Sequence, residues 1–273
     1  MNRYTWRTGL REAAMVVTAL IFLVPVWVLV NIALRGPDDH SPAMFPTMEP
    51  TLENLRAAWT RGDLGNAIVN SVVVTAVSVL FIVALAALAS YPLARVSRGW
   101  ARTLFFLFLV GLLLPFQLAL IPLYTTIRDL GLLGTLPALI LFNIGRELPL
   151  AIFLYTTFLR AIPGDYEEAA VLDGAGRLAT FVRVLFPLLA PVTGSVIVLT
   201  GVFVYNDFFT PLLYLSGSAN QTATVALSTF VGQYRSEWNV VFSGLIISSA
   251  PILVLYFILQ RTVIKGFGGG LKG

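Results

Sequence analysis

Side chains that could carry chemistry are few in this sequence. Its 273 residues contain no cysteine and a single histidine, His40. The lack of cysteine excludes thiol nucleophiles, disulfide frameworks and cysteine-held zinc or iron–sulfur centres. One histidine argues against a histidine-based metal site or catalytic triad. An enzyme would need a convergent set of catalytic groups, so we expect no catalytic residues, no metal site and no enzyme.

The adjacent charges Arg146 and Glu147 lie near the middle of a long apolar stretch. At the centre of a membrane-spanning helix each costs about 2.5–3.5 kcal/mol. Consecutive residues point about 100° apart on a helix, so we expect that the two do not simply neutralise each other. Intramembrane charges usually face an interior or a water-filled path. Two interpretations remain open: a polar lining of a translocation route, or an ion pair with a neighbouring subunit.

The elements that hold these residues are those of a membrane protein. The chain is 57% hydrophobic and 12% charged, whereas an ordinary soluble domain carries about 25% charged residues. Its mean hydropathy is +0.84. The net charge is +4, but no basic cluster accompanies it, which argues against a nucleic-acid partner. We therefore expect an all-α polytopic membrane protein within a lipid bilayer.

Six apolar stretches are each long enough to cross a bilayer, which takes about 20 residues. They cover residues 13–34, 66–90, 103–126, 136–160, 188–211 and 241–260. The first is too long for the apolar part of a signal peptide, so we expect an uncleaved span. With the N-terminus inside, 12 of the 18 Lys and Arg residues fall in inner segments, 5 in outer segments and Arg146 within a span. The positive-inside rule then places both termini in the cytoplasm.

The outer connection from residue 35 to residue 65 changes character halfway. Four prolines lie between residues 37 and 50 and exclude a helix there. Leu52, Leu55 and Trp59 then recur at helical spacing behind Thr51, which can cap a helix. We expect a short helix on the outer membrane surface, with Trp59 among the headgroups.

The connection over residues 163–187 is the most informative segment. Its pattern predicts two short amphipathic helices separated by Gly174 and Gly176, which allow a sharp change of direction. We expect Asp165 to cap the first helix, with Glu168 as its capping-box partner. So much structured and charged chain exceeds what a link between two spans requires. It therefore favours a docking surface for a cytoplasmic partner.

This connection resembles the EAA loop of ABC-transporter permeases. Glu168-Ala169-Ala170 is followed, at the spacing of that motif and without a gap, by Gly174 and by Val184-x-Phe186-Pro187. Val184 and Phe186 are apolar replacements for the usual Ile and Leu. Other segments resemble the carbohydrate importers, in particular the maltose-type permease half that ends at its sixth span: Thr51–Leu55, Tyr91–Arg95, Ile121–Tyr124, Tyr205–Phe208 and Gln260–Gly273. Pro92 and Tyr205 depart from that pattern, and the match covers residues 51–273.

The resemblance implies one type I ABC-importer transmembrane domain over residues 1–273, with six spans and a coupling helix in the 163–187 loop. By match, the ATPase-coupling residues are Glu168, Ala169, Ala170, Asp173 and Gly174. The implied partners are a second homologous permease chain, two ATPase subunits, an extracytoplasmic solute-binding protein and a carbohydrate substrate. No phosphate-binding G-x-x-x-x-G-K-[ST] occurs in the chain. ATP and magnesium are therefore expected on the ATPase subunits, with no cofactor on this chain.

Sugar recognition would need planar donors and acceptors beside an aromatic face, and the apolar stretches offer a few such groups. The candidate path-lining residues are Gln117, Asn143, Arg146, Glu147, Tyr205, Asn206 and Asp207. Unpaired polar groups are costly in lipid, so they are expected to face the interior. Helix packing accounts for each of them as well. Asn206 and Asp207 also suit a cap at the end of the fifth span or a contact with the binding protein.

The resulting expectation is a permease subunit of an ATP-driven importer. It would move an oligosaccharide or related polyol across the cytoplasmic membrane of a prokaryote by alternating access. One alternative is a secondary transporter or channel driven by an ion gradient, with Glu147 or Asp207 as a proton carrier. The lack of an evident inverted repeat and the EAA spacing argue against it. A second alternative is an ABC permease for a non-sugar solute, which the carbohydrate-type segments argue against.

Overall fold

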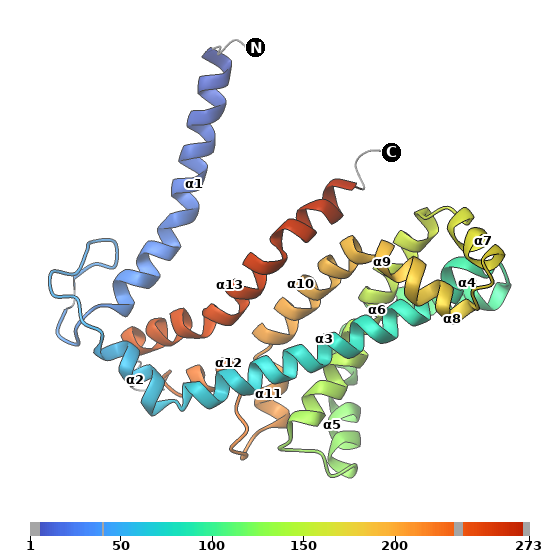
Figure 1. Cartoon of the computed structure of the whole chain (residues 1–273). Helices are drawn as coiled ribbons and strands as arrows, with labels where there is room; N and C mark the ends of the chain where they lie inside the picture. Colours follow the sequence, from blue (N-terminus) through green and yellow to red (C-terminus); the bar gives the residue numbers. More distant parts are fainter. Residues whose placement is uncertain (1–5, 40, 232–236, 270–273) are drawn as a thin grey trace. The chain divides into compact units, whose positions relative to one another are not determined.

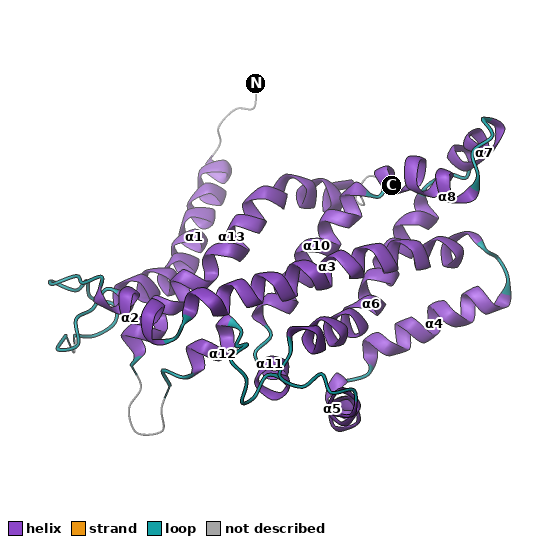
Figure 2. Ribbon diagram, turned by 60° about the horizontal axis from the view of Figure 1, so that its bottom comes forward, coloured by secondary structure: helices purple, strands orange, loops and turns teal. Residues whose placement is uncertain are grey.

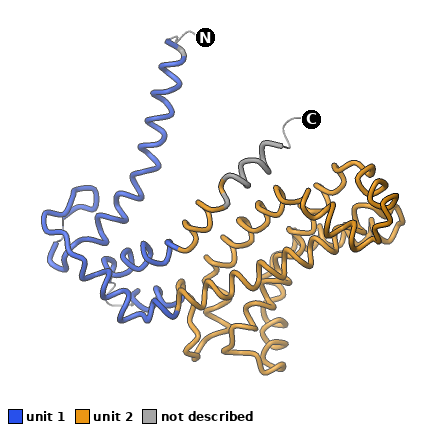
Figure 3. Tube along the Cα trace, viewed as in Figure 1, with its two compact units in different colours: residues 1–66, 225–250 blue, residues 67–224, 251–273 orange. Residues whose placement is uncertain are grey.

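The computed structural model describes residues 6–39, 41–231 and 237–269. Within these ranges the chain is built of helices joined by loops, and an isolated β-bridge joins Arg35 to Pro50 (Figures 1 and 2). The expected all-α class is confirmed. His40 and residues 270–273 of the matched C-terminal segment lie outside the described residues. Figure 3 shows the two compact units of the chain: residues 1–66 with 225–250, and residues 67–224 with 251–273.

The first unit is built around the end of a long apolar helix. Helix α1 covers Trp6–Ala33, and an 18-residue apolar window within it has no buried residue. Helix α2 covers Glu53–Arg61, and α13, which begins at Trp238 and continues to Gly269, supplies its first turns to this unit. The Asn54 and Ser243 side chains both donate hydrogen bonds to the Ala33 carbonyl, at 2.9 and 3.0 Å. These bonds join α1, α2 and α13.

Helix α2 lies where the sequence predicts a short helix. Asn54 and Ala58 are its buried residues, whereas Leu52 and Trp59 are exposed. A glycine allows the close packing near Ala58: a Cβ added to Gly244 would lie 2.2 Å from Leu227 and 3.6 Å from Ala58. The buried side of α2 therefore carries an amide and a methyl group. The amide is needed because the end of α1 presents carbonyl groups to it.

The second unit contains most of the helices. They are α3 (Leu64–Arg95), α4 (Gly99–Leu113), η1 (Phe116–Ala119), α5 (Leu120–Asp129), α6 (Leu136–Ala161), α7 (Asp165–Leu172), α8 (Arg177–Thr180), the π-helical turn η2 (Phe181–Leu185), α9 (Phe186–Leu188), α10 (Ala190–Asn206) and α11 (Phe209–Tyr214). Helix α12 (Ala223–Ser228) crosses between the units. One buried cluster centres on Tyr155, Leu159 and Leu185. A second centres on Leu139, Phe142 and Tyr214.

Helix breaks fall within one of the six predicted spans and at the edge of another. Among the described residues, four helices are long and apolar enough to cross a membrane, and two bent pairs raise the number to six. Gly99–Leu113 and Phe116–Asp129 meet at 92°, within the predicted span 103–126. Leu114 is extended there (ψ 124°) because Pro115 follows it. The segments Arg177–Leu188 and Ala190–Asn206 meet at 74°, and Asp207 ends α10 inside the predicted span 188–211.

Candidate coupling surface and polar cluster

The predicted EAA loop folds as helix α7, a tight turn and a second helical segment, at one end of the second unit (Figure 2). Gly164, not Asp165, occupies the N-cap position of α7, and no side chain caps it. The Gly164 carbonyl instead accepts the Glu167 and Glu168 amides, at 2.8 and 3.1 Å. The expected capping box is therefore wrong. The first turn of α7 contains three acidic residues, Asp165, Glu167 and Glu168. The dipole of a helix favours negative charge at this end.

Glu167 anchors α7 to the end of α3. Its Oε1 lies 2.5 Å from the Arg95 Nε, and its Oε2 accepts a hydrogen bond from the Tyr91 hydroxyl at 3.0 Å. Arg95 also donates from Nη2 to the Ile162 carbonyl, at 3.0 Å. The two charged side chains are about four-fifths buried, with 21% and 19% exposed. One guanidinium thus holds together α3, the turn after α6, and α7.

Sequence reasoning did not identify this anchor. Tyr91 and Arg95 belong to one segment of the family resemblance, and Glu167 directly precedes the EAA motif. Arg95 and Glu167 lie 72 positions apart, and no spacing rule connects positions on two separate helices. A carboxylate next to the motif and an arginine at a predicted cytoplasmic helix end were the only signals available.

Gly174 forms the turn that ends α7. Its φ of +78° lies in the left-handed region, which residues with a Cβ atom rarely adopt. The Ala175 amide donates to the Ala170 carbonyl at 2.9 Å, and the Gly174 amide donates to the Val171 carbonyl at 3.0 Å. These two bonds define a Schellman motif with Gly174 at the C′ position. The predicted change of direction thus occurs at Gly174, whereas Gly176 has an extended backbone (φ −72°, ψ 161°).

The five predicted coupling residues lie together on α7 and its final turn. Ala170 is buried, whereas the other four, Glu168, Ala169, Asp173 and Gly174, are exposed. Large apolar side chains stand beside them in contact with solvent: Leu172 is 88% exposed and Leu178 is 70% exposed. A groove of about 470 Å³ runs along this face between Glu168, Leu172 and Arg177. The surface therefore combines acidic groups, small residues and unpartnered apolar groups.

A second polar site joins α6 to the break between α10 and α11. Arg146 lies 3.4 Å from Glu147 (Nε to Oε1) and 3.4 Å from Asp207 (Nη1 to Oδ2). Its guanidinium carbon also lies 4.5 Å from the centre of the Phe116 ring, a cation–π distance. The arginine side chain is 25% exposed, and each carboxylate side chain is 8% exposed. The described part of the chain thus supplies two buried carboxylates to one partly exposed guanidinium.

This geometry corrects the expectation that Arg146 and Glu147 would not neutralise each other. The 100° step between consecutive residues separates their Cβ atoms, but the long arginine side chain covers that distance. Both carboxylates that contact Arg146 come from this chain. The signal for Asp207 was its position in a polar cluster at the end of an apolar stretch.

Asp207 also organises the backbone around it. Its Oδ1 accepts the amides of Phe209 and Thr210, at 3.1 and 3.3 Å, at the start of α11. The Thr224 hydroxyl donates to the Asp207 carbonyl at 2.8 Å. Asp207 therefore caps the helix that follows the fifth apolar stretch, while its Oδ2 faces Arg146. The Asn206 amide bonds back to the Val202 carbonyl at 2.9 Å, within its own helix.

The path-lining candidates separate into different environments. Arg146 and Glu147 line a cleft of about 700 Å³ together with Phe116, Leu150 and Phe203. Tyr205 lines another crevice, of about 470 Å³, formed by α3, α10 and the later part of α13. The other candidates line neither space: Gln117 is exposed, and Asn143 is buried, with no hydrogen-bond partner for its Oδ1 among the described residues.

The sequence and the fold are similar to those of known transport proteins. A family model described as "Binding-protein-dependent transport system inner membrane component" matches residues 83–268. The melibiose/raffinose/stachyose import permease protein MelC of Bacillus subtilis (strain 168) is 32% identical over 259 residues, which cover 94% of each chain. The diacetylchitobiose uptake system permease protein NgcG of Streptomyces coelicolor is 29% identical over 259 residues, 93% of this chain and 85% of NgcG.

A solved structure shares the fold. It is the crystal structure of a bacterial ABC transporter involved in the import of the acidic polysaccharide alginate. The match has a TM-score of 0.77 at 19% identity, and it covers 96% of this chain and 99% of the matched one. The bent helices and the α7 segment thus occur in a chain with the fold of an ABC-importer transmembrane domain. This protein belongs to the family of inner membrane components of binding-protein-dependent transport systems.

Proposed function

We propose that this chain is one of two homologous permease subunits in an ATP-driven importer for a sugar, an oligosaccharide or a related polyol. Membership of the family makes it a multi-pass transport subunit of the cytoplasmic membrane that works with an ATPase and a solute-binding protein. The proposal adds to this that there are two ATPase subunits and a second permease chain, and that the solute is a carbohydrate. The names of the oligosaccharide permeases aligned along nearly the whole chain support the substrate class.

The observation that carries the coupling role is the α7 surface. Four of its five motif residues are exposed, and Leu172 and Leu178 present apolar area that nothing in the second unit covers. An apolar and acidic surface of this kind suits a cleft on an ATPase subunit. Residues 163–187 then form the coupling segment, on the cytoplasmic side, with both termini on the same side. One transmembrane domain over residues 1–273, with spans near the six apolar stretches, completes the topology.

Transport then follows from motion of this surface. Closure of the ATPase subunits displaces α7, and the Arg95–Glu167 pair passes the displacement to α3 and to the end of α6. The paired permeases alternate between inward-facing and outward-facing states. The cleft beside Arg146 and Glu147 supplies polar groups to the solute path. No covalent step takes place on this chain.

The decisive measurement is ATP-dependent uptake of labelled oligosaccharides by proteoliposomes that contain the complete complex. Glu168→Lys reverses an exposed charge on α7, and we expect it to lower uptake about tenfold by weakening ATPase binding by about 1.4 kcal/mol. Asp129→Lys is the matched control, because Asp129 is also an exposed carboxylate, at the end of α5. Its uptake should remain near that of the unmodified complex.

Two results would refute the assignment. Normal uptake and normal ATPase co-purification with both Glu168→Lys and Gly174→Asp would refute the coupling role of α7. Uptake that continues without ATP and collapses with the proton gradient would identify a secondary transporter. The substrate class has its own test, since the ligand bound by the associated solute-binding protein can be identified directly. A non-carbohydrate ligand would overturn the sugar assignment and leave the coupling role intact.

A further inference from the structure

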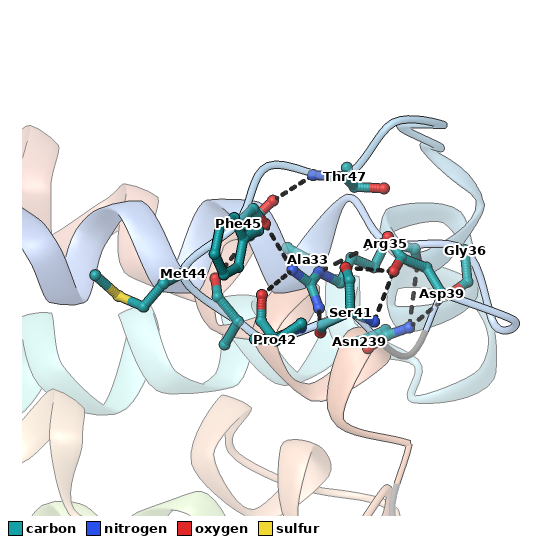
Figure 4. Close-up of polar contacts among 12 residues, drawn as sticks. Ala33, Arg35, Gly36, Asp39, Ser41, Pro42, Met44, Phe45, Thr47 and Asn239 are labelled. Atoms are coloured by element: carbon teal, nitrogen blue, oxygen red, sulfur yellow. Dashed lines mark hydrogen bonds and ion pairs between the residues drawn. The ribbon is translucent and has the colours of Figure 1, made fainter.

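The connection between α1 and α2 forms a closed loop in the first unit. Its base is the β-bridge between Arg35 and Pro50, next to a hydrogen bond from the Thr51 amide to the Leu34 carbonyl at 2.8 Å. Residues 36–49 lie between these two strand-like positions. Because the ends of the loop meet, the segment between them must turn back on itself. Figure 4 shows the polar contacts that determine where it goes.

The loop folds back along α1, alongside side chains of the membrane-spanning helix. The Trp27 indole donates to the Met44 carbonyl at 3.1 Å. The Asn31 amide donates to the Ala43 and Phe45 carbonyls, at 2.7 and 2.6 Å. Asn31 also accepts the Thr47 amide at 3.0 Å. Trp27 lies six residues before the end of α1, so the loop returns about 9 Å along the helix axis.

Arg35, just after the end of α1, also holds the loop through its side chain. Only 5% of this residue is exposed. Its guanidinium donates to the carbonyls of Ser41, Pro42 and Phe45. The Asn239 side chain donates in turn to the Arg35 carbonyl at 3.1 Å. The guanidinium is therefore a fixed internal donor group for the loop.

Every carbonyl from residue 41 to residue 45 consequently accepts a side-chain hydrogen bond. The donors are Arg35, Asn31 and Trp27, all from α1 or the residues directly after it. Pro42 and Pro46 have no amide hydrogen to satisfy. Irregular backbone is excluded from lipid because its polar groups lack partners there. In this segment the five carbonyls meet that requirement internally.

The outer side of the same segment is apolar. Met44 is 57% exposed and Phe45 is 63% exposed, and Met48 follows at 90%. The adjoining surface of α1 is also apolar and exposed, at Val26 and Val30. The apolar stretch 13–34 is about 33 Å long as a helix, close to the roughly 30 Å thickness of the hydrocarbon layer. The loop therefore extends the apolar surface that α1 exposes, and the contact with Trp27 brings it to the level of the upper acyl chains.

We propose that residues 41–48 form a membrane-inserted anchor at the Ala33 end of α1, with Met44, Phe45 and Met48 among the lipid headgroups and upper acyl chains. Arg35, Asn31 and Trp27 favour the insertion because they pair the five carbonyls of residues 41–45. The ligand of this surface is the bilayer itself. The anchor holds the end of α1 at a defined depth. It does not depend on the transported solute or on the coupling role of α7.

The absence of cysteine allows a direct test. Phe45→Cys and Asp38→Cys each provide the one cysteine of this chain for an environment-sensitive fluorophore, in the complete complex assembled with cysteine-free partner subunits in phosphatidylcholine nanodiscs. Asp38 is the matched control because it is exposed on the same loop, close to its base. A nitroxide near the headgroup end of the acyl chain should quench the label at residue 45 about twofold more than the label at residue 38. Aqueous iodide should show the opposite order.

A second pair of variants tests the cause of insertion. Adding Arg35→Gln to Phe45→Cys removes donors to three carbonyls, so the label should lose its nitroxide quenching and gain iodide quenching. Adding Arg56→Gln, which removes a charge from α2, should leave both unchanged. Stronger iodide than nitroxide quenching at residue 45 in the unmodified complex would overturn the proposal. Protection from both quenchers, or protection that requires the solute-binding protein, would overturn it in favour of a protein contact.

Discussion

Arg95 and Glu167 form the shortest ion pair in the described part of the chain, with 2.5 Å between Nε and Oε1. Arg95 is the last residue of α3, and Glu167 lies in the first turn of α7. The second oxygen of the carboxylate is held by Tyr91, and the second arm of the guanidinium by the Ile162 carbonyl. Displacement of α7 must therefore carry the ends of α3 and α6 with it or break these bonds.

Loss of the Glu167 charge should uncouple α7 from α3. Hydrogen bonds to charged groups contribute about 1.5–3 kcal/mol, so Glu167→Gln should lower ATP-dependent uptake about tenfold or more. The ATPase should still co-purify, because the exposed docking face is unchanged. Uptake and ATP hydrolysis are measured on the same preparation.

A double-mutant cycle separates this pair from general damage. Arg95→Gln and Glu167→Gln should each impair uptake, and the double variant should be little worse than either alone. Additive losses would show that the two side chains act independently. Asp129→Asn serves as the control, because Asp129 is an exposed carboxylate at the end of α5, and its uptake should be unchanged.

The sign of φ at Gly174 predicts a difference between two alanine substitutions. A Cβ added at Gly174 or at Gly164 meets no atom within 4 Å, so neither substitution causes a clash. Gly174 has a φ of +78°, and Gly164 has a φ of −66°. Gly174→Ala should destabilise the turn by about 1–2 kcal/mol. Gly164→Ala should be close to neutral. The amount of ATPase that co-purifies reports the difference, and equal losses would contradict it.

The pairing of Arg146 predicts a large loss of stability on its removal. Arg146→Gln leaves Glu147 and Asp207 as two buried carboxylates without their counter-ion, at a cost of about 3–5 kcal/mol. Arg128→Gln is the matched control, because Arg128 also pairs with the next residue in sequence but lies on the surface, where such pairs contribute about 0–1 kcal/mol. Thermal unfolding of the purified complex distinguishes the two. Similar midpoints would argue that Arg146 faces water.

The loop between α1 and α2 should resist acid. Hydrogen bonds from the Ser41 hydroxyl and amide are the main cause that lowers the pKa of Asp39 from 3.8 to about 2. A lowered pKa stabilises the fold above the unfolded value, and that stabilisation is lost as pH falls through the folded value. The label at residue 45 should therefore report an unchanged loop between pH 7 and about pH 4.

Removal of the Ser41 hydroxyl tests this cause. Ser41→Ala should raise the pKa of Asp39, so the fluorescence change of the label should begin at a higher pH. Asp38→Asn, on the same loop, should leave the midpoint where it is in the unmodified chain. A midpoint that does not respond to Ser41→Ala would show that another group controls the transition.

Sequence reasoning reached the class and the family for clear physical reasons. Long apolar stretches and a low content of charged residues predict a helical membrane protein, because each stretch can be recognised from consecutive residues. The spacing of Glu168, Gly174 and Pro187 predicted the family, which the family match and the relatives confirm. The need for a turn at Gly174 could also be predicted, since a glycine between two amphipathic segments points to a reversal. The roles of the motif residues on an ATPase remain predictions.

Local patterns failed where a side chain had two available partners. The spacing of Asp165 and Glu168 fits a capping box, but Gly164 occupies the N-cap position of α7. The neighbouring Glu167 forms an ion pair with Arg95. Helix geometry separates the Cβ atoms of Arg146 and Glu147, which predicts that the two charges do not simply neutralise each other. A flexible arginine and a backbone break at Asp207 produced a three-residue cluster instead.

The sequence by itself determined that this chain enters a membrane, where its helices form and to which family it belongs, because hydrophobicity and motif spacing are written in consecutive residues. Only the tertiary structure decided which charges meet and that residues 41–45 fold back on Trp27 and Asn31. The pairs Arg95–Glu167 and Arg146–Asp207 join positions far apart in sequence. Their energies depend on burial and direction, which exist only once the helices have packed.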